Sequence, residues 1–263
     1  MMEKYVDYHE VDPVKLYQRG LSVKQVLGIS HIAQRTLHRL LKESGIPRRG
    51  RAEAQLSRAS YSGVFLSKRQ EQIIIGSLLG DSSLDRIKSP FDNSRMKVSH
   101  RDKDKEYLDW VHSELRSTGL FPNEPHQRVD LLTWSLRSRS HPLFTEYRKL
   151  FYPDGTKVVP QSILERLDGL GLAVWYMDDG SLSWGRNHQL RIYTDGFSLS
   201  ENERIIRWFR RNYHLTFRAH RRDSSSGTYY LILSGKPQIK EFLLRVQDFV
   251  SPLSCMRRKI NVW

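Results

Sequence analysis

The stretch GLAVWYMDDG, residues 171–180, joins an apolar run directly to two carboxylates and a glycine. A buried helix that ends at glycine is ordinary, because glycine adopts the left-handed cap conformation at little cost. Two aspartates at that end are unexpected, because the unpaired carbonyls of a helix C-terminus carry partial negative charge. Asp178 and Asp179 therefore require a positive partner, either a Lys or Arg side chain or a metal ion.

An earlier stretch has the same form. Residues 73–83, IIIGSLLGDSS, are an apolar segment that runs into Asp81, and Asp179 follows 98 residues later. Each stretch opens a similar series of predicted helices and strands, which indicates an internal repeat with halves at 69–160 and 161–263. If the halves pack about a pseudo-twofold axis through the two apolar helices, the two carboxylates meet at one point.

The rest of each half alternates helices and strands. Amphipathic segments that stop at glycine or proline predict helices, and segments of alternating polarity predict strands. The predicted helices are 105–119, 141–153, 200–214 and 237–250, and the predicted strands are 94–100, 131–138, 188–198, 215–222 and 228–235. The order helix, strands, helix, strands, helix occurs twice, so we expect an α+β fold.

Charge and composition point to a nucleic-acid partner. The 263 residues include 43 Lys and Arg against 29 Asp and Glu, a formal net charge of +14. Such an excess suggests a polyanionic partner, most often nucleic acid, although a soluble basic protein without one has the same composition. The single cysteine, Cys255, excludes an internal disulfide framework and a Cys-rich zinc site, and it fits a reducing compartment.

The paired acids suggest a reaction. Carboxylates brought together repel one another unless cations lie between them, and aspartate and carbonyl oxygens suit hard ions such as Mg²⁺. In a basic protein, a metal-bridged pair of Asp81 and Asp179 indicates phosphodiester hydrolysis by metal-activated water. The ten histidines show no paired zinc spacing such as HExxH.

Charged and polar residues alternate along two of the predicted strands as they would on a sheet that faces DNA. Arg and Gln side chains recognise guanine and adenine edges respectively. The candidate DNA-binding residues on these strands are Arg95, Lys97, His100, Gln189 and Arg191. The alternative is a solvated sheet face with no DNA contact.

The two apolar stretches resemble the signature helices of the LAGLIDADG homing endonucleases in their single-chain, two-repeat form, and the resemblance covers roughly residues 70–263. It implies two αββαββα halves whose sheets form saddles in the DNA major groove, with the signature helices packed over the minor groove. It also implies that a monomer cuts both strands of a double-stranded DNA target with a divalent metal, Mg²⁺ or Mn²⁺, and leaves short 3′ overhangs.

The resemblance also assigns site residues. In that family the catalytic acid is the last one before the final glycine of each motif, and the backbone carbonyl one residue earlier is a further metal ligand. The corresponding acids and carbonyls in this sequence are Asp81 and Asp179, and Gly80 and Asp178. The side chain of Asp178 is then structural. The family's late lysine in each half corresponds to Lys157 of KVVP and to Lys259 of MRRK.

The sequence departs from the family pattern in three places. Ser82 stands where glycine is usual, and Arg258 replaces the tyrosine of MxYK. Val174 falls opposite Gly76. We expect Ser82 to alter the carbonyl geometry slightly and Val174 to widen the helix packing on one side. Neither change removes a metal ligand, and both key acids are present, which argues against a degenerate relative that only binds.

Residues 1–50 predict a separate helix-turn-helix unit. Asp12 with Pro13 and, later, Ser22 mark two helix starts, and a short turn precedes a third helix of the kind that enters the major groove. Residues 22–49 also resemble the helix-turn-helix domains of resolvases and small regulators, with His31 in place of the usual turn glycine. A three-helix bundle with no DNA role is the alternative. The outward residues would be Gln34, Arg35, His38 and Arg39.

Residues 51–68 contain few large apolar side chains and predict a linker, basic enough to lie along phosphates. Arg48, Arg49 and Arg51 are candidate phosphate contacts in and before it. A solvated surface segment is the alternative reading of each of them.

Three functions stay open. They are a site-specific DNA endonuclease with an added DNA-binding module, a regulator that kept the fold but lost the chemistry, and an intron RNA maturase. The intact acids favour the first over the second, and the helix-turn-helix favours DNA over RNA. The polar N-terminus is unlike a signal or transit peptide, and no apolar run approaches the ~20 residues of a membrane span. We therefore expect a cytoplasmic (bacterial or phage-encoded) or organellar protein.

Overall fold

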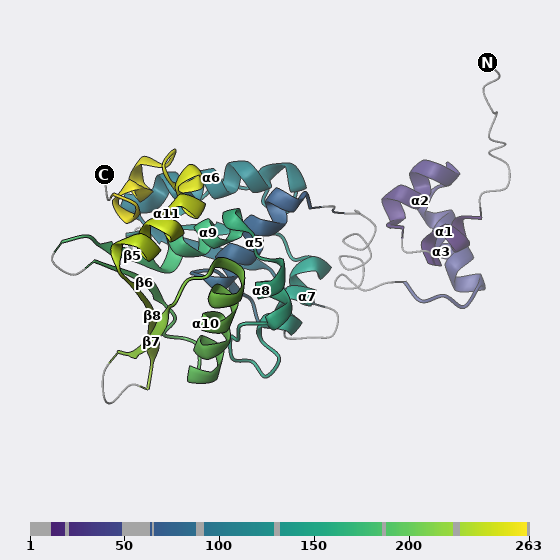
Figure 1. Cartoon of the computed structure of the whole chain (residues 1–263). Coiled ribbons are helices and arrows are strands. Elements are labelled where there is room, and N and C mark those ends of the chain that lie inside the picture. Colours follow the sequence, from purple (N-terminus) through teal and green to yellow (C-terminus); the bar gives the residue numbers. More distant parts are fainter. Residues whose placement is uncertain are drawn as a thin grey trace, which may run out of the picture. The chain divides into compact units, whose positions relative to one another are not determined.

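The computed structural model describes residues 12–18, 21–48, 64, 66–87, 92–128, 132–185, 188–222 and 227–261. The chain divides into two compact units (Figure 1). The small unit comprises Met1–Val64 with Ile87–Asn93, and the large unit comprises Phe65–Arg86 with Ser94–Trp263. None of the described helices is both long and apolar enough to cross a membrane.

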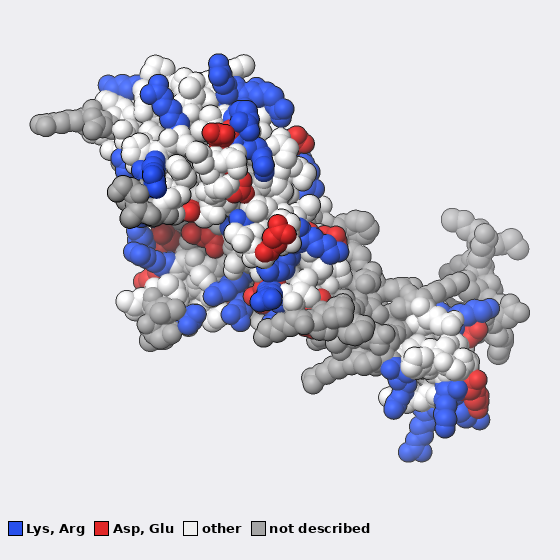
Figure 2. All heavy atoms as spheres, turned by 90° about the horizontal axis from the view of Figure 1, so that it is seen from below, with Lys and Arg blue, Asp and Glu red and all other residues white. Residues whose placement is uncertain are grey.

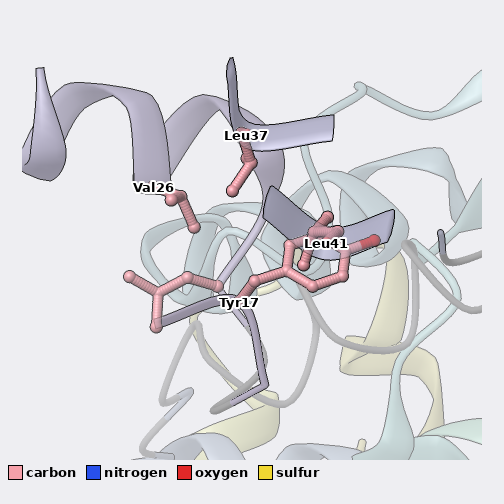
Figure 3. Close-up of a cluster of buried hydrophobic side chains, with 5 residues drawn as sticks. Tyr17, Val26, Leu37 and Leu41 are labelled. Carbon is pink, nitrogen blue, oxygen red and sulfur yellow. The ribbon is translucent and has the colours of Figure 1, made fainter. Parts of the chain in front are cut away.

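The small unit contains the three predicted helices, α1 (Pro13–Gln18), α2 (Val23–Ser30) and α3 (Gln34–Glu43). The Asp12 carboxylate accepts the Val14 amide at 2.9 Å ahead of α1, and Ser22 caps α2 in a reciprocal capping box. The apolar faces of the three helices share one core, in which the labelled side chains of Figure 3 point toward one another. Its buried members are Tyr17, Leu21, Val26, Leu37 and Leu41.

The turn between α2 and α3 uses a strained residue. His31, at the position where the helix-turn-helix domains that this segment resembles have glycine, has φ +51° and ψ +25°. This left-handed conformation is less favourable for a residue with a side chain than for glycine. The His31 amide donates to the Leu27 carbonyl at 3.0 Å, which terminates α2.

The large unit consists of two halves with the same element order, as predicted. The first half is α5 (Lys68–Leu79), β1 (Ser83–Leu84), β2 (Met96–Arg101), α6 (Lys105–Leu115), β3 (His126–Arg128), β4 (Thr133–Arg137) and α7 (Pro142–Phe151). After α8 (Gln161–Arg166), the second half is α9 (Gly169–Asp179), β5 (Gly180–Ser183), β6 (Gln189–Tyr193), α10 (Leu199–Tyr213), β7 (Arg218–Arg221), β8 (Tyr229–Ser234), α11 (Lys236–Val250) and the 3₁₀ helix η5 (Ser254–Lys259).

Each half builds one antiparallel four-stranded sheet, and the strand orders β1-β2-β4-β3 and β5-β6-β8-β7 are equivalent. The registers agree as well. Ser83 of β1 pairs with Lys97 of β2, and Ser181 of β5 pairs with Arg191 of β6. Because each serine lies two residues after a motif acid, the two acids occupy equivalent positions of the repeat.

The signature helices α5 and α9 pack against each other at the centre of the large unit (Figure 1). Their contact depends on glycine, because a Cβ added at Gly76 would lie 2.4 Å from the Gly171 carbonyl oxygen and 2.8 Å from the Val174 Cβ. The missing side chain at Gly76 is therefore what accommodates Val174, and the expected widening at this position is replaced by a close fit.

The structure also separates a short helix, α8, from the second signature helix, which the sequence pattern did not do. The chain turns at Asp168, whose carboxylate accepts the amides of Leu170 and Gly171 at 2.9 and 3.2 Å and so begins α9. The residues before this cap belong to α8. The short strands β1, β3 and β5 were not separated in the sequence pattern either, because two to four residues are too few to show alternation.

Candidate active site

The two motif acids lie at equivalent ends of the signature helices. Asp81 follows Gly80, the C-cap residue of α5, and Asp179 is the last residue of α9. Burial first, and the negative charge of Asp81 second, raise the pKa of Asp179 to about 7. The two acids lie at the ends of helices that pack against each other.

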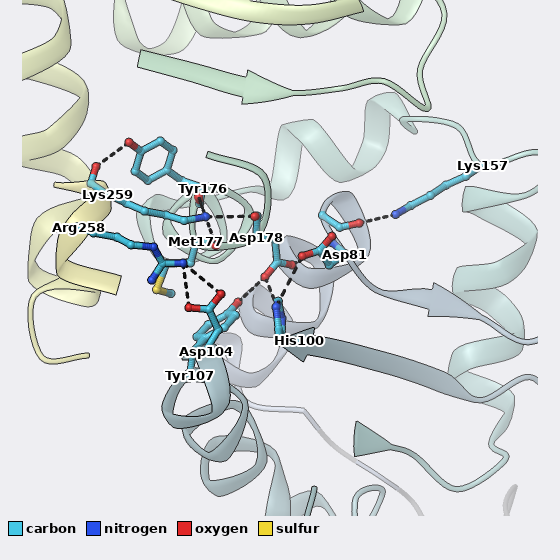
Figure 4. Close-up of polar contacts among 11 residues, drawn as sticks. Asp81, His100, Asp104, Tyr107, Lys157, Tyr176, Met177, Asp178, Arg258 and Lys259 are labelled. Carbon is cyan, nitrogen blue, oxygen red and sulfur yellow. Dashed lines mark hydrogen bonds and ion pairs between the residues drawn. The ribbon is translucent and has the colours of Figure 1, made fainter. Parts of the chain in front are cut away.

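Lys157 lies at the end of α5. Its Nζ donates to the carbonyl oxygens of Gly80 at 2.7 Å and Ser82 at 3.0 Å, on both sides of Asp81 in the chain (Figure 4). Burial lowers the pKa of Lys157, against the charges of Asp179, Asp178 and Asp81, which raise it.

Lys259 occupies the equivalent position at the end of α9. It is 9% exposed, and its Nζ donates to the carbonyl oxygens of Met177 and, at 3.1 Å, of Asp178. Gly80 and Asp178 each precede a motif acid, so both predicted lysines reach the same carbonyl of the repeat. The positive charge that the helix ends require is therefore an ammonium group on each side.

Asp178 extends from α9 into the first half. Its fully buried carboxylate accepts the Tyr107 hydroxyl at 2.8 Å and the Asp81 amide at 3.1 Å (Figure 4). A Cβ on Gly80 would lie 2.4 Å from the Asp178 Oδ2, so glycine is needed opposite this side chain. Burial, followed by the charges of Asp81 and Asp179, raises the pKa of Asp178 well above its usual value.

His100 lies in this cluster and not on the outer face of its strand. It is 7% exposed, with Nδ1 3.6 Å from Asp81 Oδ2 and Nε2 3.5 Å from Asp178 Oδ1. Burial lowers the pKa of His100, against the charge of Asp81. The prediction that His100 shares a face with Lys97 was wrong, because residues three apart on a strand point to opposite faces.

The other predicted sheet residues lie away from the helices. Lys97 on β2 and both Gln189 and Arg191 on β6 are half-buried on the outer faces of their sheets, between buried apolar neighbours. Arg191 donates to Gln189 at 2.8 Å. Arg95 precedes β2 and lies 3.6 Å from the carboxylate of Asp85.

Further cations on these outer faces were missed because sequence alternation was not followed across the whole sheet. Strand register places Arg101, Arg137 and Arg128 on the same face as Lys97, and Arg218 on the same face as Arg191. The first sheet therefore presents four basic side chains on the face that does not contact the core.

In the small unit, α3 directs its predicted residues outward. Gln34, Arg35 and Arg39 are exposed and His38 is half-buried. Arg48 is also exposed. Arg49 and Arg51 lie outside the described residues.

A cavity of about 710 Å³ opens where the two halves of the large unit meet. In Figure 2, Lys and Arg atoms flank a hollow in which Asp and Glu atoms are visible. The residues that line the cavity include Asp81, His100, Asp178, Lys259, Ser99 and Ser181. Outer-face residues of both sheets thus border the acidic cluster.

The segment that carries Lys259 is fastened to the first half. The Glu106 carboxylate of α6 accepts the amides of Ser254 at 3.0 Å and Cys255 at 2.9 Å. These bonds, with the Ser254 hydroxyl as the largest contribution, lower the pKa of Glu106 to about 2. Arg258, which replaces the family's tyrosine, pairs with Asp104 at 2.8 Å. These contacts, like that of Tyr107, join residues far apart in the chain and leave no local sequence signal.

The sequence comparisons agree with this architecture. The profile of the LAGLIDADG DNA endonuclease family matches residues 71–242, and the chain belongs to this family. Protein RecA of Mycobacterium gastri is 31% identical over 141 residues, which cover 51% of this chain and 31% of that protein. The chain thus spans less than a third of this relative's length. The cytochrome b mRNA maturase bI2 of Debaryomyces hansenii is 26% identical over 200 residues, or 71% of this chain and 72% of that protein.

Among solved structures, the homing endonuclease I-WcaI bound to its DNA recognition sequence has the same fold. It superposes with a TM-score of 0.65 at 18% identity, and the alignment covers 83% of this chain and 96% of that one. The fold class predicted from the two motifs is therefore confirmed.

Proposed function

We propose that the protein is a site-specific endonuclease that hydrolyses both strands of double-stranded DNA with a divalent metal ion, Mg²⁺ or Mn²⁺. The observation that carries the proposal is the position of the two motif acids. Asp81 and Asp179 lie at the C-terminal ends of two helices that pack against each other, each with a lysine on the adjacent carbonyl. One chain supplies both acids, so we propose that it acts as a monomer.

The residues at the site fit a hard divalent ion. The donors are carboxylate oxygens and the carbonyl oxygens of Gly80 and Asp178, a set that Mg²⁺ and Mn²⁺ accept. Burial and the charge of Asp81 raise the pKa of Asp179, while Lys157 and Lys259 lower it; a bound cation would also favour the charged form of this carboxyl. When bound, the ion supplies Lewis acidity and lowers the pKa of a water molecule that attacks the phosphodiester.

The chain's own groups position the substrate and offset charge. Lys157 and Lys259 hold the carbonyls next to the acids in place and are near enough to offset negative charge that develops at two scissile phosphates. The outer faces of the two sheets supply cations for the phosphate backbone and amide and guanidinium groups for base edges. Candidates for these contacts are Lys97, Arg101, Gln189 and Arg191.

We propose that the domains follow the sequence prediction, with a helix-turn-helix at 1–50, a linker at 51–68 and the two repeats at 69–160 and 161–263. Exposed Gln34, Arg35 and Arg39 on α3 suit a second DNA contact. Tethering this unit to the repeats makes its binding intramolecular, which raises affinity without adding catalytic groups.

Cleavage of a random-sequence duplex library tests the function. The purified chain is incubated with the library and Mg²⁺, and the cut ends are sequenced. A single enriched site with paired cuts a few base pairs apart supports the proposal. Intact duplexes at every protein concentration would contradict it.

A second candidate function is assistance to intron RNA folding. The similarity to a cytochrome b mRNA maturase favours it, and basic sheet faces also suit RNA. The presence of both motif acids favours DNA hydrolysis, because RNA binding does not need them. Retained RNA binding by a variant that has lost both acids, together with absent DNA cleavage by the unaltered chain, would support the maturase reading.

A further inference from the structure

Among the residues that the structure describes, one triad of side chains could hold a metal ion, and it lies on the Asp81 side of the active site. Asp81, His100 and Asp178 each direct one donor atom into a common space, and these atoms lie within 4.8 Å of one another. The imidazole stands between the two carboxylates, as Figure 4 shows. Each of the three side chains can thus offer one ligand atom to a single ion.

The imidazole is buried but incompletely bonded. His100 is more than nine-tenths buried, and its Nε2 has no hydrogen-bond partner among the groups that the structure describes. A buried polar atom without a partner is costly, and here it faces the Asp178 carboxylate at 3.5 Å. The hydroxyl of Tyr107 donates to the same carboxylate oxygen, an outer contact of the kind that orients metal ligands.

The described part of the second half has no equivalent of this triad. Thr194 and His100 occupy equivalent positions of the two halves. In each half, one strand residue pairs with the serine that lies two residues after the motif acid, and His100 or Thr194 lies three residues further along the chain. The Thr194 hydroxyl is engaged, since it donates to Asn202 at 2.6 Å. Gly80 is the equivalent of Asp178 and has no side chain. Two of the three donors are thus specific to the Asp81 side.

We propose that Asp81, His100 and Asp178 form a site for a divalent transition-metal ion that accepts a nitrogen ligand, such as Mn²⁺, Co²⁺ or Zn²⁺. An imidazole with two carboxylates suits these ions, whereas Mg²⁺ prefers oxygen donors and retains its water. The inference rests on the proposed function only in that Asp81 is shared with the catalytic site. It makes the two halves unequal in metal preference.

The test uses Co²⁺ and the full chain without DNA. Isothermal titration gives affinity and stoichiometry, and the visible absorption of bound Co²⁺ reports its ligands. We expect one preferred Co²⁺ ion on the unaltered chain. His100→Gln should weaken its binding at least about tenfold, as even outer-sphere changes can, and should change the absorption spectrum. His126→Gln, at an exposed histidine of the same half, is the matched control and should change neither.

Two more variants keep the result interpretable. Asp178→Asn keeps the shape of the side chain and should also weaken Co²⁺ binding, so it replaces His100→Gln if that variant does not fold, as judged by circular dichroism. Asp179→Asn should abolish DNA cleavage while the Co²⁺ spectrum persists, which separates this site from the proposed function. Unchanged Co²⁺ affinity and spectrum in folded His100→Gln or Asp178→Asn would overturn the proposal, even if Mg²⁺-dependent cleavage is observed.

Discussion

The two halves of the large unit share one strand order but differ in what surrounds their acids. In the first half, Asp81 is accompanied by a buried histidine and by a carboxylate from the other half. In the second half, Thr194 stands in the position of His100 and Gly80 in that of Asp178, and burial with the charge of Asp81 raises the pKa of Asp179 to about 7. The backbone positions of the two halves are equivalent but the side chains at them differ, so the two sites are chemically unequal.

The two lysines, in contrast to the surroundings of the acids, make equivalent contacts in the two halves. Lys157 and Lys259 come from different local structures, an irregular segment and a 3₁₀ helix, yet both reach the carbonyl that precedes a motif acid. The equivalence lies in the contact and not in the element. This indicates that a positive charge at each helix end is the feature that both halves require.

The largest effect is expected from substitution of the motif acids, which both halves share. Asp81→Asn or Asp179→Asn should lower double-strand cleavage by at least about a hundredfold, the scale on which loss of one active-site electrostatic contact acts. DNA affinity should persist or rise, because one negative charge near the phosphates is lost. Plasmid linearisation and a gel-shift titration measure the two quantities. Wild-type cleavage by both variants would show that these acids are not the catalytic pair.

Substitution of either lysine should affect cutting by one half of the site more than by the other. Lys157→Met and Lys259→Met should each slow cutting by about tenfold, equivalent to about 1.4 kcal/mol of lost charge stabilisation. Each serves one side of the site, so nicked plasmid should accumulate. End-labelled duplexes should show opposite strands left intact in the two variants. Equal slowing of both strands by each variant would mean that the halves are not independent.

Removal of residues 1–66 tests whether the repeats act alone. A chain beginning at Ser67 should still cut at saturating concentration, since both acids and all repeat elements remain. It should bind more weakly and show a shallower salt dependence, by about 0.9 log units per lost phosphate contact. Its footprint should shorten on one flank only, because a single added unit breaks the symmetry of the repeats. An unchanged footprint would remove the assigned role of Gln34, Arg35, His38 and Arg39.

Packing at the pseudo-twofold axis should be sensitive to one methyl group. Gly76→Ala would place a Cβ 2.4 Å from the Gly171 carbonyl oxygen, and overpacking of this kind costs about 1–3 kcal/mol. Gly185→Ala is the control, because nothing lies within 4 Å of a Cβ there. Urea unfolding measures both variants. Equal stabilities would mean that α5 and α9 can move apart freely.

The smallest expected effect concerns pH and the fastening of the segment that carries Lys259. The folded pKa of Glu106 is lowered to about 2, so its contribution to stability is complete above its ordinary pKa of 4.5 and is lost as pH falls toward 2. The stability difference between the unaltered chain and Glu106→Gln should therefore shrink over that window. The group is exposed, so the difference should be small. A difference that grows on acidification would contradict the assignment.

Much of the architecture was predictable because it follows from local sequence patterns. The capping serine of α2, the repeated order of helices and strands and the two acids follow from residue types at short spacings, whereas the full αββαββα order was implied by the family resemblance. The shared environment of the two lysines also followed, though from resemblance to the family and not from spacing. The face of His100 was predicted wrongly, because residues an odd number of positions apart on a strand point to opposite faces of the sheet.

The sequence by itself determined the repeat, the paired acids and the separate three-helix unit, since helix and strand periodicities act between residues close in the chain. Only the tertiary structure decided that Asp178 crosses from α9 to meet His100 of β2 and Tyr107 of α6. It also decided that Glu106 holds the segment bearing Lys259. Contacts of this kind join residues far apart in the sequence, and the packing of α5 against α9, set by Gly76 and Gly171, brings them together.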